Sequence, residues 1–141
     1  MAELRVFAPI VTSVLASSDA CDRVPVLGGE TVLRVNPREV LVIGDTDLDG
    51  LRRAVGESTG LVEDVSDGWA GFVLEGDDAR AAFARLSELA LPATGWVQGE
   101  VARAAANVVV EPGRLTLLVP AMVAAHIEER IRADAAEVLA P

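Results

Sequence analysis

Lysine is absent from this chain, and all 12 of its basic residues are arginines. Catalysis through a lysine Schiff base is therefore excluded, as is a phosphate-binding loop that depends on a lysine. We attribute the absence itself to genomic base composition. Acidic residues number 22, so the formal net charge is −10. This charge argues against nucleic acid and anionic membrane surfaces as partners, because both bind through clustered cations.

Cysteine and histidine occur once each, as Cys21 and His126, and tyrosine is absent. One cysteine cannot form an intrachain disulfide, which favours a cytoplasmic location. We expect Cys21 to be structural, and His126 to be packed or interfacial, because a lone histidine builds neither a histidine-rich metal site nor a two-histidine relay. Two of the five aromatic residues are Trp69 and Trp96, and we expect one of them to lie in the core and the other at an interface.

The chain also lacks an apolar run long enough to span a membrane. The longest, Leu115 to Ala125, is too short and contains Pro120. The segment from Val6 to Ala16 follows no cationic lead of the kind found in signal peptides, so it is expected to form an N-terminal strand. With 141 residues and 51% hydrophobic residues, the chain suits one domain with apolar surface to spare for a subunit interface.

One pattern occurs twice: an apolar run, a turn with proline and a charge, a second apolar run and a helix-like stretch. The first copy is Val32–Asn36, Pro37–Glu39 and Val40–Ile43, and the second is Val108–Glu111, Pro112–Arg114 and Leu115–Val119. Such a strand–turn–strand–helix unit cannot bury its own apolar face. We therefore expect an α+β fold of residues 1–141 as a single compact domain. Two intertwined half-repeats, about 31–56 and 107–139, would share one core around a central 61–105 segment.

Further elements are predicted between and after the repeats. Residues 17–30 are polar and turn-rich, which predicts a loop. The stretch after Asp47 carries Leu48, Leu51 and Val55 at helical spacing and ends at Gly56. The segments 61–65 and 69–74 are expected to be strands joined by a tight turn at 66–68.

Two more helices are predicted in the second half of the chain. One begins at Asp77 or Asp78, which would supply the N-cap, and continues to Leu89. Residues 96–106 are expected to be extended. The last helix follows Pro120 and places these apolar residues on one face: Val123, Ile127, Ile131, Ala135 and Val138.

No motif predicts a catalytic, cofactor-binding or metal-binding residue. Asp45–Gly50 resembles the start of a calcium loop, but the twelfth position, where a bidentate carboxylate is needed, is Gly56, and the acid falls at Glu57. The acids are better explained by the dipole of the following helix. The Asp77–Asp78 pair is likewise expected to act as a cap, and the glycines at 28 and 29 lack the spacing of a phosphate cradle.

Several short motifs together resemble the folate-binding aminomethyltransferase superfamily, to which the glycine-cleavage T-protein belongs. Leu61–Ser66 followed by Phe72–Ala79 is similar to its D-L-S…v-x-G-x-D-A stretch. Within that superfamily, the gamma subunit of heterotetrameric sarcosine oxidase is most similar. The shared features are a strand pair around Asn36–Glu39, Leu91–Pro92 after the helix, and Pro120 before the last helix. The resemblance extends from about Val32 to Ile131.

The resemblance implies a scaffold that has lost its site. Aminomethyltransferases carry a folate-directed aspartate after this helix, where the present chain has Leu89 or Ala90. The implied function is a non-catalytic gamma-like subunit of an oxidoreductase complex in sarcosine and one-carbon metabolism. FAD, FMN, NAD and tetrahydrofolate would lie on larger partner subunits, with none bound by this chain. The alternative is a free-standing folate- or small-ligand-binding module that self-associates.

Overall fold

The computed structural model describes residues 1–25, 29–56 and 60–141, which divide into two units. Unit 1 combines Met1–Ala8 with Asp67–Pro141, and unit 2 is Pro9–Ser66. This division differs from the single domain that the sequence led us to expect. The half-repeats 31–56 and 107–139 fall in different units, and the 61–105 segment is divided between the units after Ser66.

Unit 2 is a four-stranded antiparallel sheet with strand order β3-β4-β2-β5. Its elements along the chain are β2 (Val11–Leu15), α1 (Ser18–Asp22), β3 (Thr31–Asn36), β4 (Glu39–Ile43), α2 (Leu48–Val55) and β5 (Leu61–Asp64). A strand, helix, strand, strand, helix and strand in this spatial order form two split βαβ units, the arrangement of ferredoxin-like folds.

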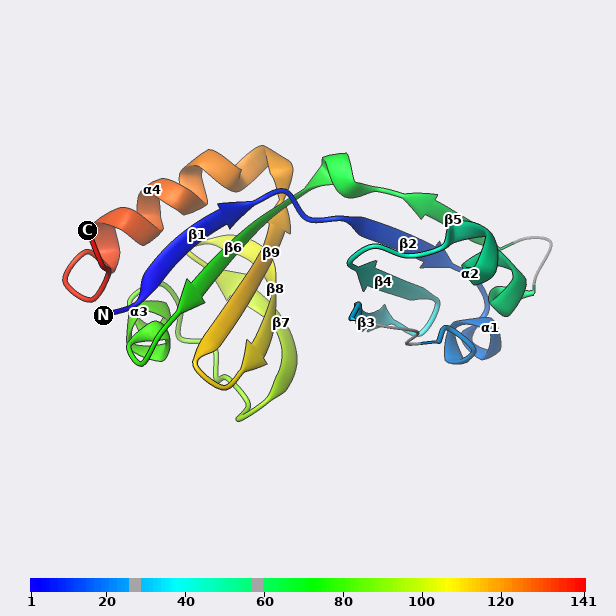
Figure 1. The fold of residues 1–141 in the computed structure, drawn as a ribbon, viewed down its shortest axis with the longest axis horizontal. Coiled ribbons are helices and arrows are strands. Elements are labelled where there is room, and N and C mark those ends of the chain that lie inside the picture. Colours follow the sequence, from blue (N-terminus) through cyan, green and yellow to red (C-terminus); the bar gives the residue numbers. More distant parts are fainter. Residues whose placement is uncertain (26–28, 57–59) are drawn as a thin grey trace. The chain divides into compact units, whose positions relative to one another are not determined.

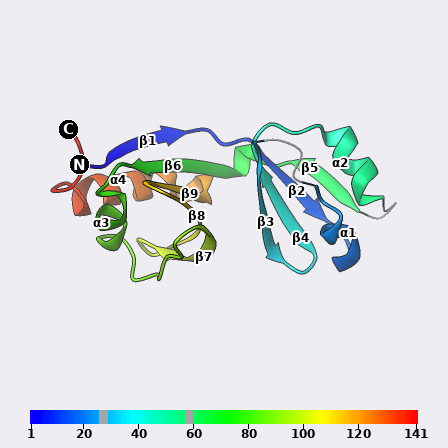
Figure 2. The same ribbon diagram turned by 60° about the horizontal axis from the view of Figure 1, so that its bottom comes forward.

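The core of unit 2 lies between its sheet and its helices, which Figure 2 shows beside the strands. Alternate residues of the strands face the helices because successive side chains of a strand point to opposite faces. They pack with α1 and α2 in one cluster of buried residues that includes Val14, Val40, Val42, Val62, Ala20, Cys21, Leu51 and Val55. Gly56, at φ 69°, ends α2 as predicted.

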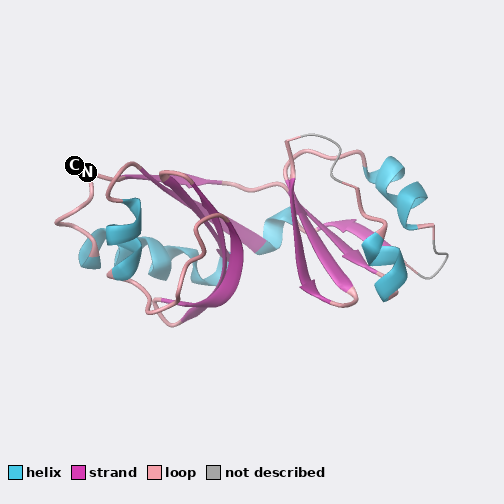
Figure 3. Ribbon diagram, turned by 90° about the horizontal axis from the view of Figure 1, so that it is seen from below, coloured by secondary structure: helices cyan, strands magenta, loops and turns pink. Residues whose placement is uncertain are grey.

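Unit 1 is a five-stranded antiparallel sheet with strand order β1-β6-β9-β8-β7. Its strands are β1 (Glu3–Phe7), β6 (Trp69–Glu75), β7 (Gly95–Val101), β8 (Ala104–Glu111) and β9 (Arg114–Pro120). Its helices are α3 (Ala79–Ala84) and α4 (Ala124–Asp134), with a short 3-10 turn, η2 (Ala121–Val123), before α4. Figure 3 shows these helices on one side of the curved sheet.

The last helix packs as its spacing predicts. Ile127, Ile131 and Ala135 are fully buried in the cluster that includes Phe72, Leu117 and other strand residues. The two ends of the chain meet in the same unit (Figure 1), where Ala2 bonds through its backbone to Val138 and Ala140 at 2.8 and 2.7 Å. These bonds join the two termini, and β1 itself is held in the sheet by its antiparallel pairing with β6.

The two hairpins hold corresponding places in their sheets. The turns at Pro37 and Pro112 join β3 to β4 and β8 to β9. In each case the second strand of the hairpin also pairs with an earlier strand: β4 pairs with β2, and β9 pairs with β6. A helix then follows each hairpin, α2 after β4 and α4 after β9. The segments Val40–Ile43 and Leu115–Leu118 therefore occupy matching positions. In unit 1, β1 stands at the edge that β5 fills in unit 2, and β7 is an addition.

Several boundaries differ from the sequence-based predictions. The expected strand at Val6–Ala16 is two strands, β1 and β2, which belong to different sheets. The segment predicted as a loop at 17–30 contains α1, which begins where the Ser17 hydroxyl accepts the backbone N–H of Ala20 at 3.1 Å. Local polarity concealed this helix, because most of its residues favour turns when judged alone.

The tight turn at 66–68 also does not make a hairpin. It forms a 3-10 turn, η1 (Ser66–Gly68), and the strands on either side enter different sheets: β5 pairs with β2, and β6 pairs with β1 and β9. The helix predicted to continue to Leu89 ends at Ala84, although Leu86 and Leu89 still pack on the core. Hydrophobic spacing continues there because the chain stays on the core after it leaves the helix.

Candidate functional site

The Asp64-Val65-Ser66 motif, which carries part of the family resemblance, forms a cluster of hydrogen bonds at the end of β5. The Ser66 hydroxyl accepts the backbone N–H of Val11 at 2.8 Å and donates to Asp64 Oδ1 at 2.6 Å. The backbone N–H of Val65 donates to the carbonyl of Val11 at 2.9 Å. These hydrogen bonds join the end of β5 to the start of β2, so the role of the motif here is structural.

The same contacts perturb the acidity of Asp64. The Ser66 hydroxyl and then the Ser66 backbone N–H, at 2.9 Å, stabilise the charged carboxylate, so they lower the pKa of Asp64. A carboxylate that accepts two such bonds stays ionised at neutral pH. It is therefore not suited to act as a general acid.

The acidic sequences that could have bound a cation make ion pairs instead. Asp49 pairs with Arg52 at 3.1 Å, and Asp47 lies 3.8 Å from Arg53. No group of three or more metal-ligating side chains is found among the described residues, which exclude Glu57 and Gly28. Asp47 occupies the N-cap position of α2 without forming a side-chain cap bond.

The predicted cap at Asp77 or Asp78 is wrong in its mechanism. Asp78 occupies the N-cap position of α3 but makes no side-chain hydrogen bond to that helix. Its carboxylate instead lies 3.4 Å from the amino terminus of Met1. A local sequence pattern could not reveal this contact, because the amino terminus reaches α3 only through the pairing of β1 with β6.

Cys21 is packed in a core, whereas His126 lies on the exposed surface of α4. Cys21 is 3% exposed in the core of unit 2, with its Sγ 3.9 Å from the carbonyl of Ala16. His126 Nε2 lies 3.1 Å from the carbonyl of Ala102. Trp69 and Trp96, at the starts of β6 and β7, are both half-buried and pair with Pro120 and Val109.

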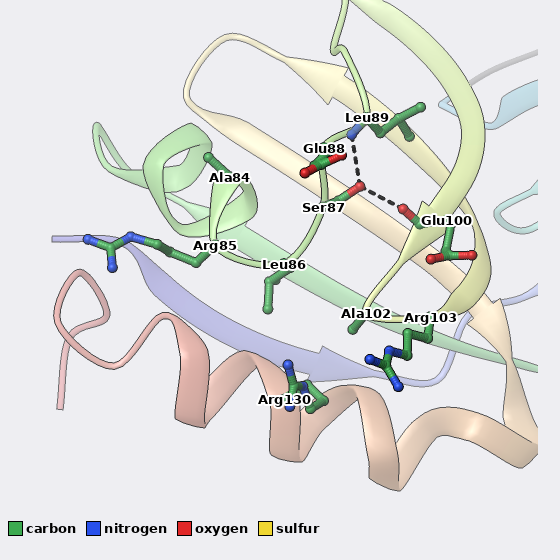
Figure 4. A pocket seen from close by; sticks show the side chains of 10 residues that line it. All are labelled: Ala84, Arg85, Leu86, Ser87, Glu88, Leu89, Glu100, Ala102, Arg103 and Arg130. Carbon is green, nitrogen blue, oxygen red and sulfur yellow. Dashed lines mark hydrogen bonds between the residues drawn. The ribbon is translucent and has the colours of Figure 1, made fainter.

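Unit 1 carries a surface depression of about 710 Å³ beside the segment that follows α3 (Figure 4). Leu86 and Ala102 supply buried apolar lining. Charged side chains surround them: Arg103 and Arg130 on one side, and Glu88 and Glu100 on the other. The sequence did not mark this site, because its residues come from three separate segments, 84–89, 100–103 and Arg130.

A hydrogen-bonded scaffold shapes the depression. The Ser87 hydroxyl donates to the carbonyl of Glu100 at 2.6 Å and accepts the backbone N–H of Leu89 at 3.0 Å. Leu89, one of the two positions at which the resemblance would place an acidic residue, packs on Gly99, where an added Cβ would approach the Leu89 Cδ1 to 2.7 Å. The apolar side chain of Leu89 can accept no proton, so the charged groups of the depression are its arginines and the carboxylates of Glu88 and Glu100.

One buried polar group stands apart from this depression. Asn107, on β8, is 2% exposed, and its Oδ1 has no hydrogen-bond partner among the described residues. Because its neighbours Ala106 and Val108 belong to the helix-covered core, Asn107 points to the other face of the sheet. We assign it no chemical role.

Comparison with known proteins places the fold. The chain superposes on a chain of the heterotetrameric sarcosine oxidase from Corynebacterium sp. U-96, solved in complex with pyrrole 2-carboxylate, with a TM-score of 0.81. The match covers 99% of this chain and 86% of that one at 19% sequence identity. The fold resemblance predicted from the sequence is therefore confirmed, while the specific folate-binding character of the repeats stays a prediction.

A second solved structure shares the fold more distantly. It is a C-terminal regulatory domain assigned to aspartate kinase from Porphyromonas gingivalis W83, matched with a TM-score of 0.51 and 14% identity over 95% of this chain and 96% of that one. No protein-family model matches the chain, and no curated protein does. Among the described residues, no helix is both long and apolar enough to cross a membrane.

Proposed function

We propose that this protein is a non-catalytic, gamma-like subunit of a sarcosine oxidase-type complex. The observation that carries the proposal is the length-wide match to one chain of the heterotetrameric enzyme, which includes 99% of this chain. Asp49 and Asp78 form ion pairs, and His126 Nε2 lies 3.1 Å from the carbonyl of Ala102, which supports a structural role for these residues. The complex would act in sarcosine and one-carbon metabolism.

In this proposal the cofactors belong to the partners. FAD, FMN, NAD and tetrahydrofolate would be held by the larger subunits, and this chain would complete their assembly. The expected absorption spectrum of the purified chain is free of flavin, whereas a complex that contains the chain should carry flavin through gel filtration. Flavin retained by the chain alone would contradict this part of the proposal.

Co-expression tests the assembly directly. The tagged chain is expressed with the products of the genes adjacent to its own, and the captured material is examined by gel filtration with light scattering. We expect a stoichiometric complex that oxidises sarcosine. If the chain associates with no oxidase subunit and elutes as a monomer, the proposal fails.

A free-standing ligand-binding module is the second candidate, favoured by the shared fold of a regulatory domain. Such a module would self-associate and bind folate or another small ligand. Titration of the isolated chain with tetrahydrofolate, followed by calorimetry and thermal shift, distinguishes the two. Absence of heat and of a shift would remove the folate version of this candidate.

A further inference from the structure

Arg103 differs from the other arginines of this chain in having no polar partner. Among the residues that the structure describes, its side chain alone of the 12 arginines makes neither a hydrogen bond nor an ion pair. Neighbouring Arg130 pairs with Asp134 at 2.6 Å, and Arg85 lies 3.4 Å from Glu137. The Arg103 guanidinium borders the depression described above (Figure 4). It is therefore a cation available to a ligand or partner.

The backbone that carries Arg103 is held in an unfavourable conformation. Ala102 and Arg103 form the turn between β7 and β8 with φ values of 48° and 67°, in the left-handed region. Turns of this kind normally use asparagine or glycine, because a side chain with a Cβ is strained there. Here the chain keeps a long cationic side chain at the strained position.

Neighbouring groups fix this turn on both sides. The backbone N–H of Ala102 donates to the carbonyl of Leu86 at 2.9 Å, and its own carbonyl lies 3.1 Å from His126 Nε2. Strain of this type persists where surrounding contacts determine the geometry, and it concentrates at binding sites. His126, the lone histidine, thus helps to hold the turn that presents Arg103.

The shape and charge of the depression suit a protein segment better than a small molecule. Small-molecule sites bury most of their ligand, whereas the charged side chains here are exposed at the surface. Arginine is enriched at the centres of protein interfaces, and its planar fork can bind a carboxylate through two parallel bonds. The acids Glu88 and Glu100, opposite Arg103, would orient a segment that carries a basic group as well.

We propose that this depression is where a larger subunit of the complex docks, with a carboxylate of that subunit bound to Arg103. The inference rests on the proposed function and specifies the surface that serves it. The partner segment would place an acidic side chain on the Arg103 and Arg130 side, and a basic or donor group near Glu88 and Glu100. Leu86 would contact the apolar part of that segment.

The test measures assembly of the full complex with variants at Arg103. Arg103→Ala and Arg103→Glu should raise the Kd of subunit association at least tenfold, with the charge reversal more severe. Arg103→Lys should recover part of the affinity, because it keeps the charge but loses the planar fork. Arg53→Glu, on the exposed surface of α2, is the matched charge control and should assemble like the wild type.

The outcomes separate this inference from the proposed function. If the wild-type chain assembles with no oxidase subunit, the proposed function fails and this inference fails with it. If the wild type assembles and Arg103→Glu assembles equally well, the docking surface is wrong while the proposed function stands. If Arg103 variants lose calorimetric binding of succinate to the isolated chain but assemble normally, the depression is a small-carboxylate site and the docking proposal is overturned.

Discussion

The Ser66 hydroxyl accepts the backbone N–H of Val11 at 2.8 Å, although the two residues lie 55 positions apart in the chain. Val11 begins β2, and Ser66 follows β5, the strand beside β2. The bond therefore fixes the register at one end of this strand pair. It also gives a structural reason for the serine in the Asp64-Val65-Ser66 motif.

Replacement of Ser66 by alanine should destabilise the chain. Loss of the hydroxyl leaves the Val11 N–H without its partner, and one such bond contributes about 0.5–1.5 kcal/mol. Equilibrium urea denaturation measures the change. Ser13→Ala, a half-buried position on β2, is the control and should change stability by less than about 0.5 kcal/mol. Equal effects of the two variants would show that the bond contributes nothing.

Asp64 should make stability depend on acidic pH. Its folded pKa lies below the unfolded value, which is about 3.9 for aspartate, so the folded state favours the carboxylate. The stabilisation is present above the unfolded pKa and is lost as the pH falls through the folded pKa. Wild type should exceed Asp64→Asn in stability at neutral pH, and the difference should shrink below about pH 4. Urea denaturation across that range provides the test, and a difference that widens on acidification would contradict it.

The helix-covered cores should respond alike in the two units. Leu51 is 2% exposed in unit 2, and Ile127 is fully buried in unit 1. Truncation of either to alanine should cost about 2–5 kcal/mol, because it removes apolar burial and leaves a cavity. Thermal and urea denaturation give the values. Glu128→Ala removes only an exposed pair with Arg132 and should cost less than about 1 kcal/mol.

Asp78 should contribute through its ion pair with the amino terminus. Both groups are about half exposed, so Asp78→Ala is expected to cost less than about 1 kcal/mol, below the loss typical of a well-made N-cap. Acetylation of the amino terminus should reproduce most of this loss, and it should add little to the variant. Additive losses from the two changes, measured by thermal denaturation, would show that they act separately.

Relief of the strained turn should stabilise the isolated chain. Arg103→Gly permits φ 67° without a Cβ clash and should raise the free energy of unfolding by up to about 1 kcal/mol. Subunit assembly should weaken in the same variant, as in Arg103→Ala. Denaturation of the isolated chain and the assembly assay together check these opposite signs. A destabilised Arg103→Gly would show that the arginine supports the fold.

Local pattern was sufficient for much of the fold. The apolar runs and prolines at 37 and 112 predicted both hairpins, and the spacing of Ile127, Ile131 and Ala135 predicted the buried face of α4. These features follow from the periods of strands and helices, which any short segment displays by itself. The composition by itself also excluded lysine chemistry and a two-histidine relay, since it contains neither lysine nor a second histidine.

Tertiary structure decided which sheet each strand joins and which charges remain available. The turn at 66–68 is compatible with a hairpin, yet β5 and β6 enter different sheets, because their pairing depends on β2 and β1, both far away in the chain. Arg103 resembles every other arginine in the sequence. Its lack of a partner emerges only once folding has placed the other acids and carbonyls against their own neighbours, because hydrogen bonds and ion pairs depend on proximity in space.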